Sequence, residues 1–514
     1  MAGGVTDSDR VRALGLGTLA TLLYLCTAPA VPNADGLGYL KLLPHNFAPG
    51  HLLYMPALRG LTHLLGGDGL SAGRLLNAVL GGTGVVLTYG LVRRALGALP
   101  LGRPFSAEDI RFAASFAAAG LGLSFGYWIQ GADVEAYAGA MVALLATVRL
   151  LVAYAARPTL WRALAVGALL GISVMCHLTH VVLTPFVFAY LFAHAPSRRD
   201  SWLHATLAVA LGGLSTIGGY AYAALYVRKH DLAGAIIWIS SAQHGFVQSN
   251  GIYRLADAIY GLAKSIIFSP YLHESDAPRL LGQFLLGLAP LIALGALYVS
   301  RRRALPPVEW RLGLLWIAPY AMLGVLFFGS DSERWLFILP ALWLLAATLV
   351  AERPHRVREA LLVLAYLGVL NFATGLWPQH ADSAIRGHAE SAARPLHDGD
   401  LIVFPGHSWD EYVSFFTGAK VTPFPIAYYA ARDGVEAGWQ RLEKEVSDAH
   451  ARGGKVYALR VFDEHDEDPR GFEELASLGL DHAALREHLR TRATVVPLPG
   501  DGAPVVRLDW QSTP

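Results

Sequence analysis

Charged residues, cysteines and nucleotide-binding motifs are all scarce in this chain. Only 16% of its 514 residues are charged, whereas a soluble protein normally carries about 25%. The two cysteines, Cys26 and Cys176, both lie in apolar runs, so they offer neither a disulfide framework nor a paired-cysteine metal site. Glycine pairs occur in apolar runs without a P-loop lysine, which argues against nucleotide binding, and no nucleic-acid-binding pattern is present.

Apolar sequence is abundant instead. Hydrophobic residues make up 54% of the chain, and the mean hydropathy is +0.39. Apolar runs of about 20 residues, the length that crosses a bilayer, recur between Leu14 and Leu376. We therefore predict an α-helical polytopic membrane protein with about eleven transmembrane helices.

Arginine clusters predict the orientation of these spans, because cytoplasmic loops carry the excess of basic residues. Arg10 and Arg12 place the N-terminus in the cytoplasm. The first run, Leu14–Val31, resembles a signal peptide, but Ala28-Pro29-Ala30 is a poor cleavage site and further spans follow. We interpret this run as an uncleaved anchor.

The first outer loop, residues 32–70, contains an apolar segment from His51 to Leu65 that is short and interrupted by proline and glycine. If this segment crossed the membrane, Arg93 and Arg94 would lie outside, against the charge rule. We therefore predict a surface helix in the outer leaflet.

The remaining spans alternate across the membrane, and a long outer loop is expected at 228–278. The predicted spans are Leu14–Val31, Leu75–Val92, Phe112–Trp128, Tyr137–Ala155, Leu164–Cys176, Val181–Ala193, Leu203–Tyr226, Leu280–Val299, Leu312–Phe328, Trp335–Val350 and Leu361–Trp377.

The composition changes after Pro378. Of the 81 charged residues, 36 lie between Ala381 and Pro514. Strand-like runs alternate there with helical stretches, which favours a small α/β layer fold. We predict a transmembrane module at 1–378 and a soluble α/β domain at 379–514, which the span count places outside the cytoplasm.

Acidic residues gather in three short outer loops. They are Asp35, then Asp133 with Glu135, then Asp331 with Glu333, which the basic Arg334 follows. If these loops converge on one external cavity, they provide a general base and partners for a phosphate or a metal. The alternative is that each acid only marks the boundary with water.

Several short stretches match a known family in order and in position relative to the spans. They are Asp35-Gly36, Pro44-His45, Pro49 to Tyr54, Arg74 to Asn77, Phe125 to Trp128, Val134 to Tyr137, Gly171, His177 to Thr179, and Glu333 to Phe337. Over roughly residues 13–350 the chain resembles the GT-C glycosyltransferases, and most of all the bacterial relatives of protein O-mannosyltransferases. The resemblance also suggests a bacterial inner membrane.

The resemblance implies transfer of a sugar from a polyprenyl-phosphate donor to an acceptor outside the cytoplasm, a protein, a glycan or a lipid. Asp35 would be the base that deprotonates the acceptor hydroxyl, with inversion at the sugar. Arg334, and after it Arg74, would hold the departing phosphate. The substrate-binding candidates are His45, His51, Arg74, Asp133, Glu135, His177, His180, Glu333 and Arg334.

One departure from the family pattern leaves alternatives open. Relatives often carry a second acid a few residues after the first, and here Asp35 is followed by Gly36-Leu37-Gly38-Tyr39. Asp35 acts alone, or Glu135 provides the missing charge, or the chain is an inactive scaffold for envelope assembly. A transporter or flippase is a further alternative, although no internal repeat is apparent.

No metal or cofactor is required by the sequence. Paired histidines such as His177 and His180 more often contact neighbouring helices or substrate than zinc. The acidic loops suit Mg²⁺ or Mn²⁺, but without the spacing of a dedicated site. We interpret the acidic tract Asp463–Asp468 as a solvated turn.

Overall fold

The computed structural model describes residues 6–43, 47–97, 105–240, 253–267, 307–326, 331–351, 357–381, 384–405, 412–413, 415–416, 420–462, 482–498 and 505–510. The chain forms two compact units. Unit 1 is Met1–Pro29 with Leu42–His380, and unit 2 is Ala30–Lys41 with Ala381–Pro514. The predicted span Leu280–Val299, His45 and the tract Asp463–Asp468 lie outside the described residues.

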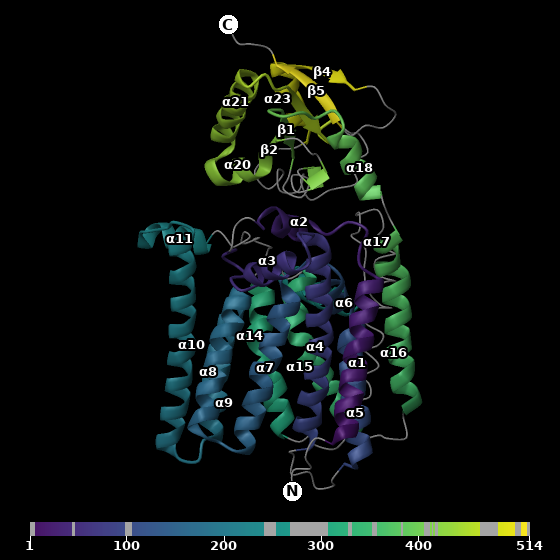
Figure 1. Ribbon diagram of the computed structural model, residues 1–514, viewed down its shortest axis with the longest axis vertical. Coiled ribbons are helices and arrows are strands. Elements are labelled where there is room, and N and C mark those ends of the chain that lie inside the picture. The colour runs from purple at the N-terminus through teal and green to yellow at the C-terminus, as the bar shows by residue number, and fades with distance from the viewer. Residues whose placement is uncertain are drawn as a thin grey trace. The chain divides into compact units, whose positions relative to one another are not determined.

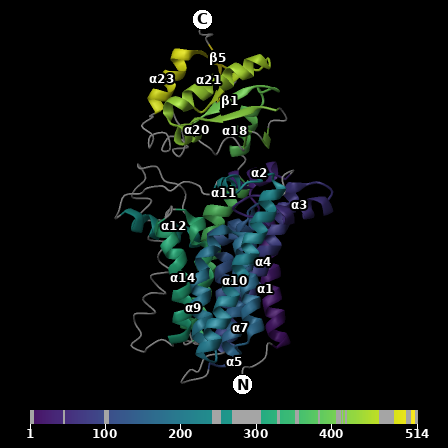
Figure 2. The same cartoon turned by 90° about the vertical axis from the view of Figure 1, so that its left-hand side faces the viewer.

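Unit 1 is built of helices that run side by side along most of its length (Figures 1 and 2). Its helices are α1 (Asp7–Cys26), α3 (Tyr54–Leu64), α4 (Gly69–Gly97), α5 (Ala107–Leu123), α6 (Phe125–Ala132), α7 (Tyr137–Ala156), α8 (Leu160–Cys176), η1 (Leu178–Leu183), α9 (Thr184–His194), α10 (Arg198–Tyr226), α11 (Leu232–Ser240), α12 (Tyr253–Ile266), α14 (Pro307–Leu326), η3 (Ser332–Ile338), α15 (Leu339–Ala351), α16 (Val357–Asn371), η5 (Phe372–Leu376) and α17 (Trp377–Ala381). Helix α4 packs against α1, α5 and α7, and α8 packs against α7 and α10.

Among the described residues, five helical segments are long and apolar enough to cross a membrane. They are Gly69–Gly97, Tyr137–Ala156, Arg198–Tyr226, Ser332–Ala351 and Val357–His380, and the bent pair α5–α6 makes a sixth candidate. Three shorter apolar helices are Leu160–Cys176, Leu178–His194 and Leu315–Leu326. The chain is thus a mostly helical multi-pass membrane protein with a small sheet, and the larger span count stays a prediction.

The predicted span Phe112–Trp128 is not one straight helix. It breaks at Ser124, where α5 and α6 meet at a bend of 65°. The Ser124 hydroxyl donates to the Gly120 carbonyl at 2.8 Å and accepts from the indole nitrogen of Trp343 at 3.0 Å. Hydroxyls next to a helical backbone compete for its carbonyls and often accompany a bend, and periodicity alone does not reveal this.

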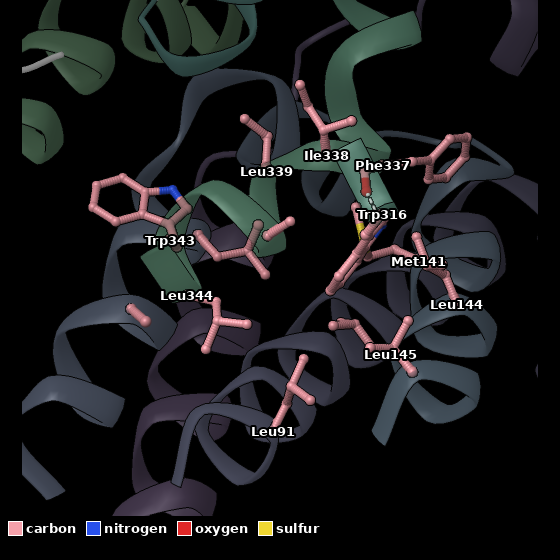
Figure 3. Packing of buried hydrophobic residues seen from close by; sticks show 14 of the residues in the cluster. Leu91, Met141, Leu144, Leu145, Trp316, Phe337, Ile338, Leu339, Trp343 and Leu344 are labelled. Atoms are coloured by element: carbon pink, nitrogen blue, oxygen red, sulfur yellow. Dashed lines mark hydrogen bonds between the residues drawn. The ribbon is translucent and has the colours of Figure 1, made fainter. Parts of the chain in front are cut away.

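The core of unit 1 lies where α4, α7, α14 and α15 meet (Figure 3). Trp316 of α14 is fully buried beside Met141 and Leu144 of α7. Its indole nitrogen donates to the carbonyl of Phe337 at 2.9 Å, within the 3-10 helix η3. The buried carbonyl of Phe337, close to where η3 ends and α15 begins, thus has a hydrogen-bond donor.

Helices α8 and α10 approach closely because Gly167 has no side chain. A Cβ at Gly167 would lie 2.2 Å from the carbonyl oxygen of Ala208, which no real contact allows. Small residues are common where membrane helices meet, since they bring the backbones into van der Waals contact.

At the opposite end of the bundle from α3, the buried carboxylate of Asp9 joins α1, α4 and α5 (Figure 1). Arg93, Arg111 and the Tyr89 hydroxyl donate to it at 3.3, 3.1 and 3.2 Å. Burial alone would raise the pKa of Asp9, but hydrogen bonds from Thr6 and the two guanidinium groups hold it well below its usual value.

Unit 2 contains α2 (Ala34–Lys41) and an α/β layer of residues 384–510. Its elements are α18 (Ala384–Ala393), β1 (Leu401–Phe404), β2 (Thr422–Pro425), α20 (Ile426–Asp433), α21 (Val435–Ala451), β3 (Val456–Leu459), α23 (His482–Arg492), β4 (Ala493–Pro497) and β5 (Val505–Trp510). The strand order is β2-β1-β3-β5-β4, with β1 parallel to β2 and β3, and β5 antiparallel to β3 and β4.

Both faces of the central strand β1 are covered. Leu401 and Val403 pack into a core with residues of α21 and α23, whereas Ile402 and Phe404 pack into a second core with residues of α18. A strand buried on both faces is expected to be apolar throughout, as in Leu401-Ile402-Val403-Phe404. Gly434, whose φ of +89° suits glycine, separates α20 from α21. The amphipathic pattern of residues 433–451 predicts the second of these helices, α21.

We expect Asp9→Ala to destabilise unit 1, because two partly buried arginines lose their shared carboxylate. The cost is on the order of 3 kcal/mol. The measurement is the thermal midpoint in detergent, followed by tryptophan fluorescence. Asp7→Ala is the control, because the Asp7 side chain is 99% exposed and only pairs with Arg10 at 3.7 Å. Equal midpoints for the two variants would contradict this role for Asp9.

Candidate functional site

The turn between α6 and α7 carries two of the predicted acids and is buried. Asp133 is 2% exposed and Glu135 is fully buried. The side-chain amide of Asn77, on α4, donates to the backbone carbonyls of Asp133 and Glu135 at 2.7 and 2.6 Å. One buried side chain of α4 therefore fixes the backbone that presents both carboxylates.

Tyr54 and Arg74 lie beside this turn. Tyr54, the first residue of α3, is buried within interaction range of Asn77, and the Arg74 guanidinium donates to the Pro29 carbonyl. Burial raises the pKa of Tyr54 well above its usual value, and the charges of Glu135 and Asp133 raise it further. The phenol therefore stays protonated beside the two acids and keeps its ability to donate a hydrogen bond.

The third acidic loop is ordered by its own helix cap. The Asp331 carboxylate accepts a hydrogen bond from the backbone N–H of Glu333 at 3.0 Å and so caps the start of η3. The same carboxylate lies 3.5 Å from the Arg334 guanidinium. The amide of Gln130, on α6, donates to the Glu333 carboxylate at 3.1 Å. This bond connects the η3 loop to α6, directly before the turn with Asp133 and Glu135.

Three histidines form an aromatic cluster against the same loops. The His177 ring lies 4.7 Å from His51, 4.9 Å from Tyr137 and 5.1 Å from Phe337, centroid to centroid. His180 is buried, and its ring centroid is 4.3 Å from Phe337. The cluster thus joins the segment before α3, the α8–η1 junction and η3.

Hydrogen bonds define the tautomers of two of these rings. His180 Nε2 lies 3.2 Å from the Ala140 carbonyl, which can only accept, so Nε2 carries a proton and Nδ1 accepts from the Tyr320 hydroxyl at 2.5 Å. In His177, Nδ1 accepts the backbone N–H of Thr179 at 3.3 Å, so the neutral ring carries its proton on Nε2. His177 is therefore a neutral donor rather than a base at Nδ1.

Tyr137 lies close to both acidic loops of unit 1. Its phenol lies within electrostatic range of Glu135 and of Asp331, Glu333 and Arg334. Its ring also contacts His177 and Phe337. Carboxylates, a guanidinium and neutral hydroxyl and imidazole donors therefore share one small region, which suits a hydroxylated ligand that carries a phosphate.

The structure brings together most of the predicted site residues in unit 1. They are His51, Arg74, Asp133, Glu135, His177, His180, Glu333 and Arg334. Asp35 is exposed in the first turn of α2, within unit 2, so its role stays a prediction. His45 lies outside the described residues.

Five further residues belong to this region and were not predicted as site residues: Tyr54, Asn77, Gln130, Tyr137 and Tyr320. Asn77 and Gln130 had a detectable signal, because an amide within an apolar helix is costly unless it has a partner. Tyr54 and Tyr137 lie in stretches that carry the family resemblance, whereas nothing in the sequence around Tyr320 distinguishes it from an ordinary interfacial aromatic.

Among the described residues, no group of three or more histidine, cysteine or acidic side chains is arranged to hold a metal ion. The carboxylates of the region are hard oxygen ligands of the kind that Mg²⁺ or Mn²⁺ prefers. A divalent cation therefore stays a prediction here.

We expect Asn77→Ala to destabilise unit 1 on the order of 2 kcal/mol, because it removes the donor to two buried carbonyls. Thermal unfolding in detergent measures this cost. Thr88→Val on the same helix is the matched control, because Thr88 is buried and its hydroxyl has no hydrogen-bond partner among the described residues. The role of Asn77 is refuted if both variants unfold at the wild-type temperature.

Comparisons with known proteins agree on the fold. No protein-family model matches the chain, and no curated protein matches it. ArnT from Cupriavidus metallidurans superposes with a TM-score of 0.58 in its apo state, at 11% identity over 96% of each chain. The same enzyme bound to undecaprenyl phosphate gives 0.57, at 11% identity over 98% of each chain.

The archaeal oligosaccharyltransferase AglB from Archaeoglobus fulgidus, in complex with an inhibitory peptide and a dolichol-phosphate, gives a TM-score of 0.54 at 12% identity. That match covers 99% of this chain and 75% of AglB. Identities this low show likeness of fold alone. The chain has the fold of the GT-C glycosyltransferases.

Proposed function

We propose that this protein is a glycosyltransferase that takes a sugar from a polyprenyl-phosphate donor and passes it to an acceptor outside the cytoplasm. The observation that carries the proposal is the Gln130–Glu333 bond. It connects the loop of Glu333 and Arg334 to α6, directly before the turn with Asp133 and Glu135, and Tyr137 lies within electrostatic range of both loops. Support comes from the fold, because one structure with this fold contains undecaprenyl phosphate and another contains a dolichol-phosphate.

The proposed reaction is a single displacement. Asp35 takes the proton of the acceptor hydroxyl while that oxygen attacks the anomeric carbon of the sugar. The bond between the anomeric carbon and the phosphate oxygen breaks, and polyprenyl phosphate leaves with the electron pair. Attack from the side opposite the leaving group inverts the anomeric configuration.

Arg334 is proposed to hold the departing phosphate. A guanidinium matches two phosphate oxygens at once and stays charged, so it stabilises the negative charge that develops on the leaving group. Arg74 is the second candidate, because it lies in the same region within electrostatic range of Asp133.

The remaining residues are proposed to orient the sugar. Carboxylates accept hydrogen bonds from sugar hydroxyls, which suits Asp133, Glu135 and Glu333. His177 and Tyr54 contribute neutral donors. The proposals of an acceptor outside the cytoplasm and of an inner-membrane location rest on the sequence resemblance alone.

Replacing the proposed base tests the reaction. In nanodiscs that contain a mixed pool of polyprenyl-phosphate sugars and candidate acceptors, wild type should release labelled sugar. Asp35→Asn should lower turnover by about 10²-fold or more, because an amide cannot take the proton. Asp68→Asn is the matched control, because Asp68 caps α4 through the backbone N–H groups of Leu70 and Ser71 and asparagine caps equally well.

The outcomes separate the alternatives. Equal turnover in wild type and Asp35→Asn would contradict the role of Asp35 and move the base to Glu135 or Asp133. Absence of turnover in wild type with every donor and acceptor class, despite donor binding, would contradict the transferase and favour a scaffold or flippase.

Replacing the proposed phosphate ligand tests the donor site. Arg334→Gln should lower kcat/KM for the donor by about tenfold or more, because a charge-assisted hydrogen bond to the departing phosphate is worth about 1.5–3 kcal/mol. Steady-state kinetics over a donor titration measures the change. An unaltered kcat/KM in Arg334→Gln together with a lowered kcat/KM in Arg74→Gln would assign the phosphate to Arg74 instead.

A further inference from the structure

Helix α3 has two distinct faces. Tyr54, Met55, Leu58 and Thr62 are buried, and Tyr54 contributes to the acidic region described above. A second face, with residues at i, i+3, i+4 and i+7, lines a groove of about 360 Å³. The lining residues are Phe47, Pro56, Arg59, Gly60, His63, Tyr222 and Tyr226.

The groove has aromatic walls and an open floor. Phe47 packs edge-on against Tyr222 and Tyr226, with ring centroids 6.0 and 5.2 Å apart. Gly60 also lines the groove, and a Cβ built on it would meet nothing within 4 Å. Flat rings therefore surround a space that a ligand group can enter.

Arg59 gives the groove a positive charge. Arg59 donates from Nε to the Nε2 of His63 at 3.4 Å, so the two side chains lie together on one edge. The described residues that line the groove include no aspartate or glutamate. An anion is therefore the complementary ligand, and a guanidinium favours a phosphate.

The position of the groove indicates where that anion comes from. Tyr222 and Tyr226 lie in the last turns of α10, a candidate span of which only 28% of the apolar window is buried inside the protein. Leu214, Ile217 and Leu225 on this helix are 69%, 67% and 58% exposed. Apolar side chains that face lipid, followed by tyrosines, mark the level of the headgroups.

We propose that this groove binds the phosphate headgroup of an anionic phospholipid from the surrounding bilayer. Arg59 and His63 hold the phosphate, Tyr222 and Tyr226 flank the glycerol, and the acyl chains lie along the exposed face of α10. The polyprenyl donor is not the occupant, since its phosphate is assigned to Arg334 at the region that adjoins the Tyr54 side of α3. The exclusion of the polyprenyl donor rests on the proposed function.

The test uses full-length protein in nanodiscs of equal parts phosphatidylglycerol and phosphatidylcholine. Native mass spectrometry after release counts the lipids of each kind that stay bound. Wild type should retain phosphatidylglycerol preferentially. Arg59→Gln should lower the ratio of bound phosphatidylglycerol to phosphatidylcholine about fivefold, since one basic residue near the surface is worth about 1 kcal/mol.

Two further variants separate a built site from general surface charge. Tyr222→Leu with Tyr226→Leu keeps the charge and the apolar character but removes the aromatic walls, and it should also lower the ratio. Arg199→Gln, an exposed arginine at the other end of α10, removes the same charge outside the groove and should leave the ratio unchanged.

Three results would overturn the proposal. They are equal retention of the two lipids by wild type, an equal loss in Arg199→Gln and Arg59→Gln, and displacement of phosphatidylglycerol by added undecaprenyl phosphate that binds wild type but not Arg59→Gln. The last result would assign the groove to the polyprenyl donor. Since the side chains replaced are exposed or half-buried, the thermal midpoints should stay at the wild-type value.

Discussion

The arrangement of unit 1 depends on one constraint, that backbone polar groups at membrane depth must find partners inside the protein. Where its helices break, buried side chains meet this need. The amide of Asn371 donates to the carbonyls of Leu123 and Ile266 at 2.8 and 2.9 Å. Tyr24 donates to the Gly122 carbonyl at 3.0 Å. The breaks are therefore stable features that long-range contacts specify.

The breaks create the candidate site. A continuous helix from α6 into α7 would leave no turn to present Asp133 and Glu135, and a regular start to α15 would not form the capped 3-10 turn that holds Arg334. Side chains from α4 and α14 stabilise these turns through Asn77 and Trp316. The same hydrogen bonds that stabilise the bundle thus place acids and a guanidinium together at its end.

Much of the fold could be predicted from the sequence. Apolar runs and arginine clusters predict the spans that appear as α4, α7 and α10, and the alternation of strand-like and helical runs after Pro378 predicts the α/β layer of unit 2. The Ser124 break and the Gln130–Glu333 bond were not predictable, because each depends on residues far apart in the chain that meet only after packing. Local sequence patterns also do not predict that the candidate acids belong to two different units. Asp35 belongs to unit 2, together with residues 381–514, whereas the other acids belong to unit 1.

The most direct test of the central claim is a structure of the full chain in nanodiscs with polyprenyl phosphate bound. The claim is that the loops around Tyr137 form one site for a lipid-linked phosphate. It predicts phosphate density in hydrogen-bond contact with the Arg334 guanidinium, close to Tyr137 and Glu333. Phosphate density away from these residues, with the region around Tyr137 unchanged, would contradict the claim.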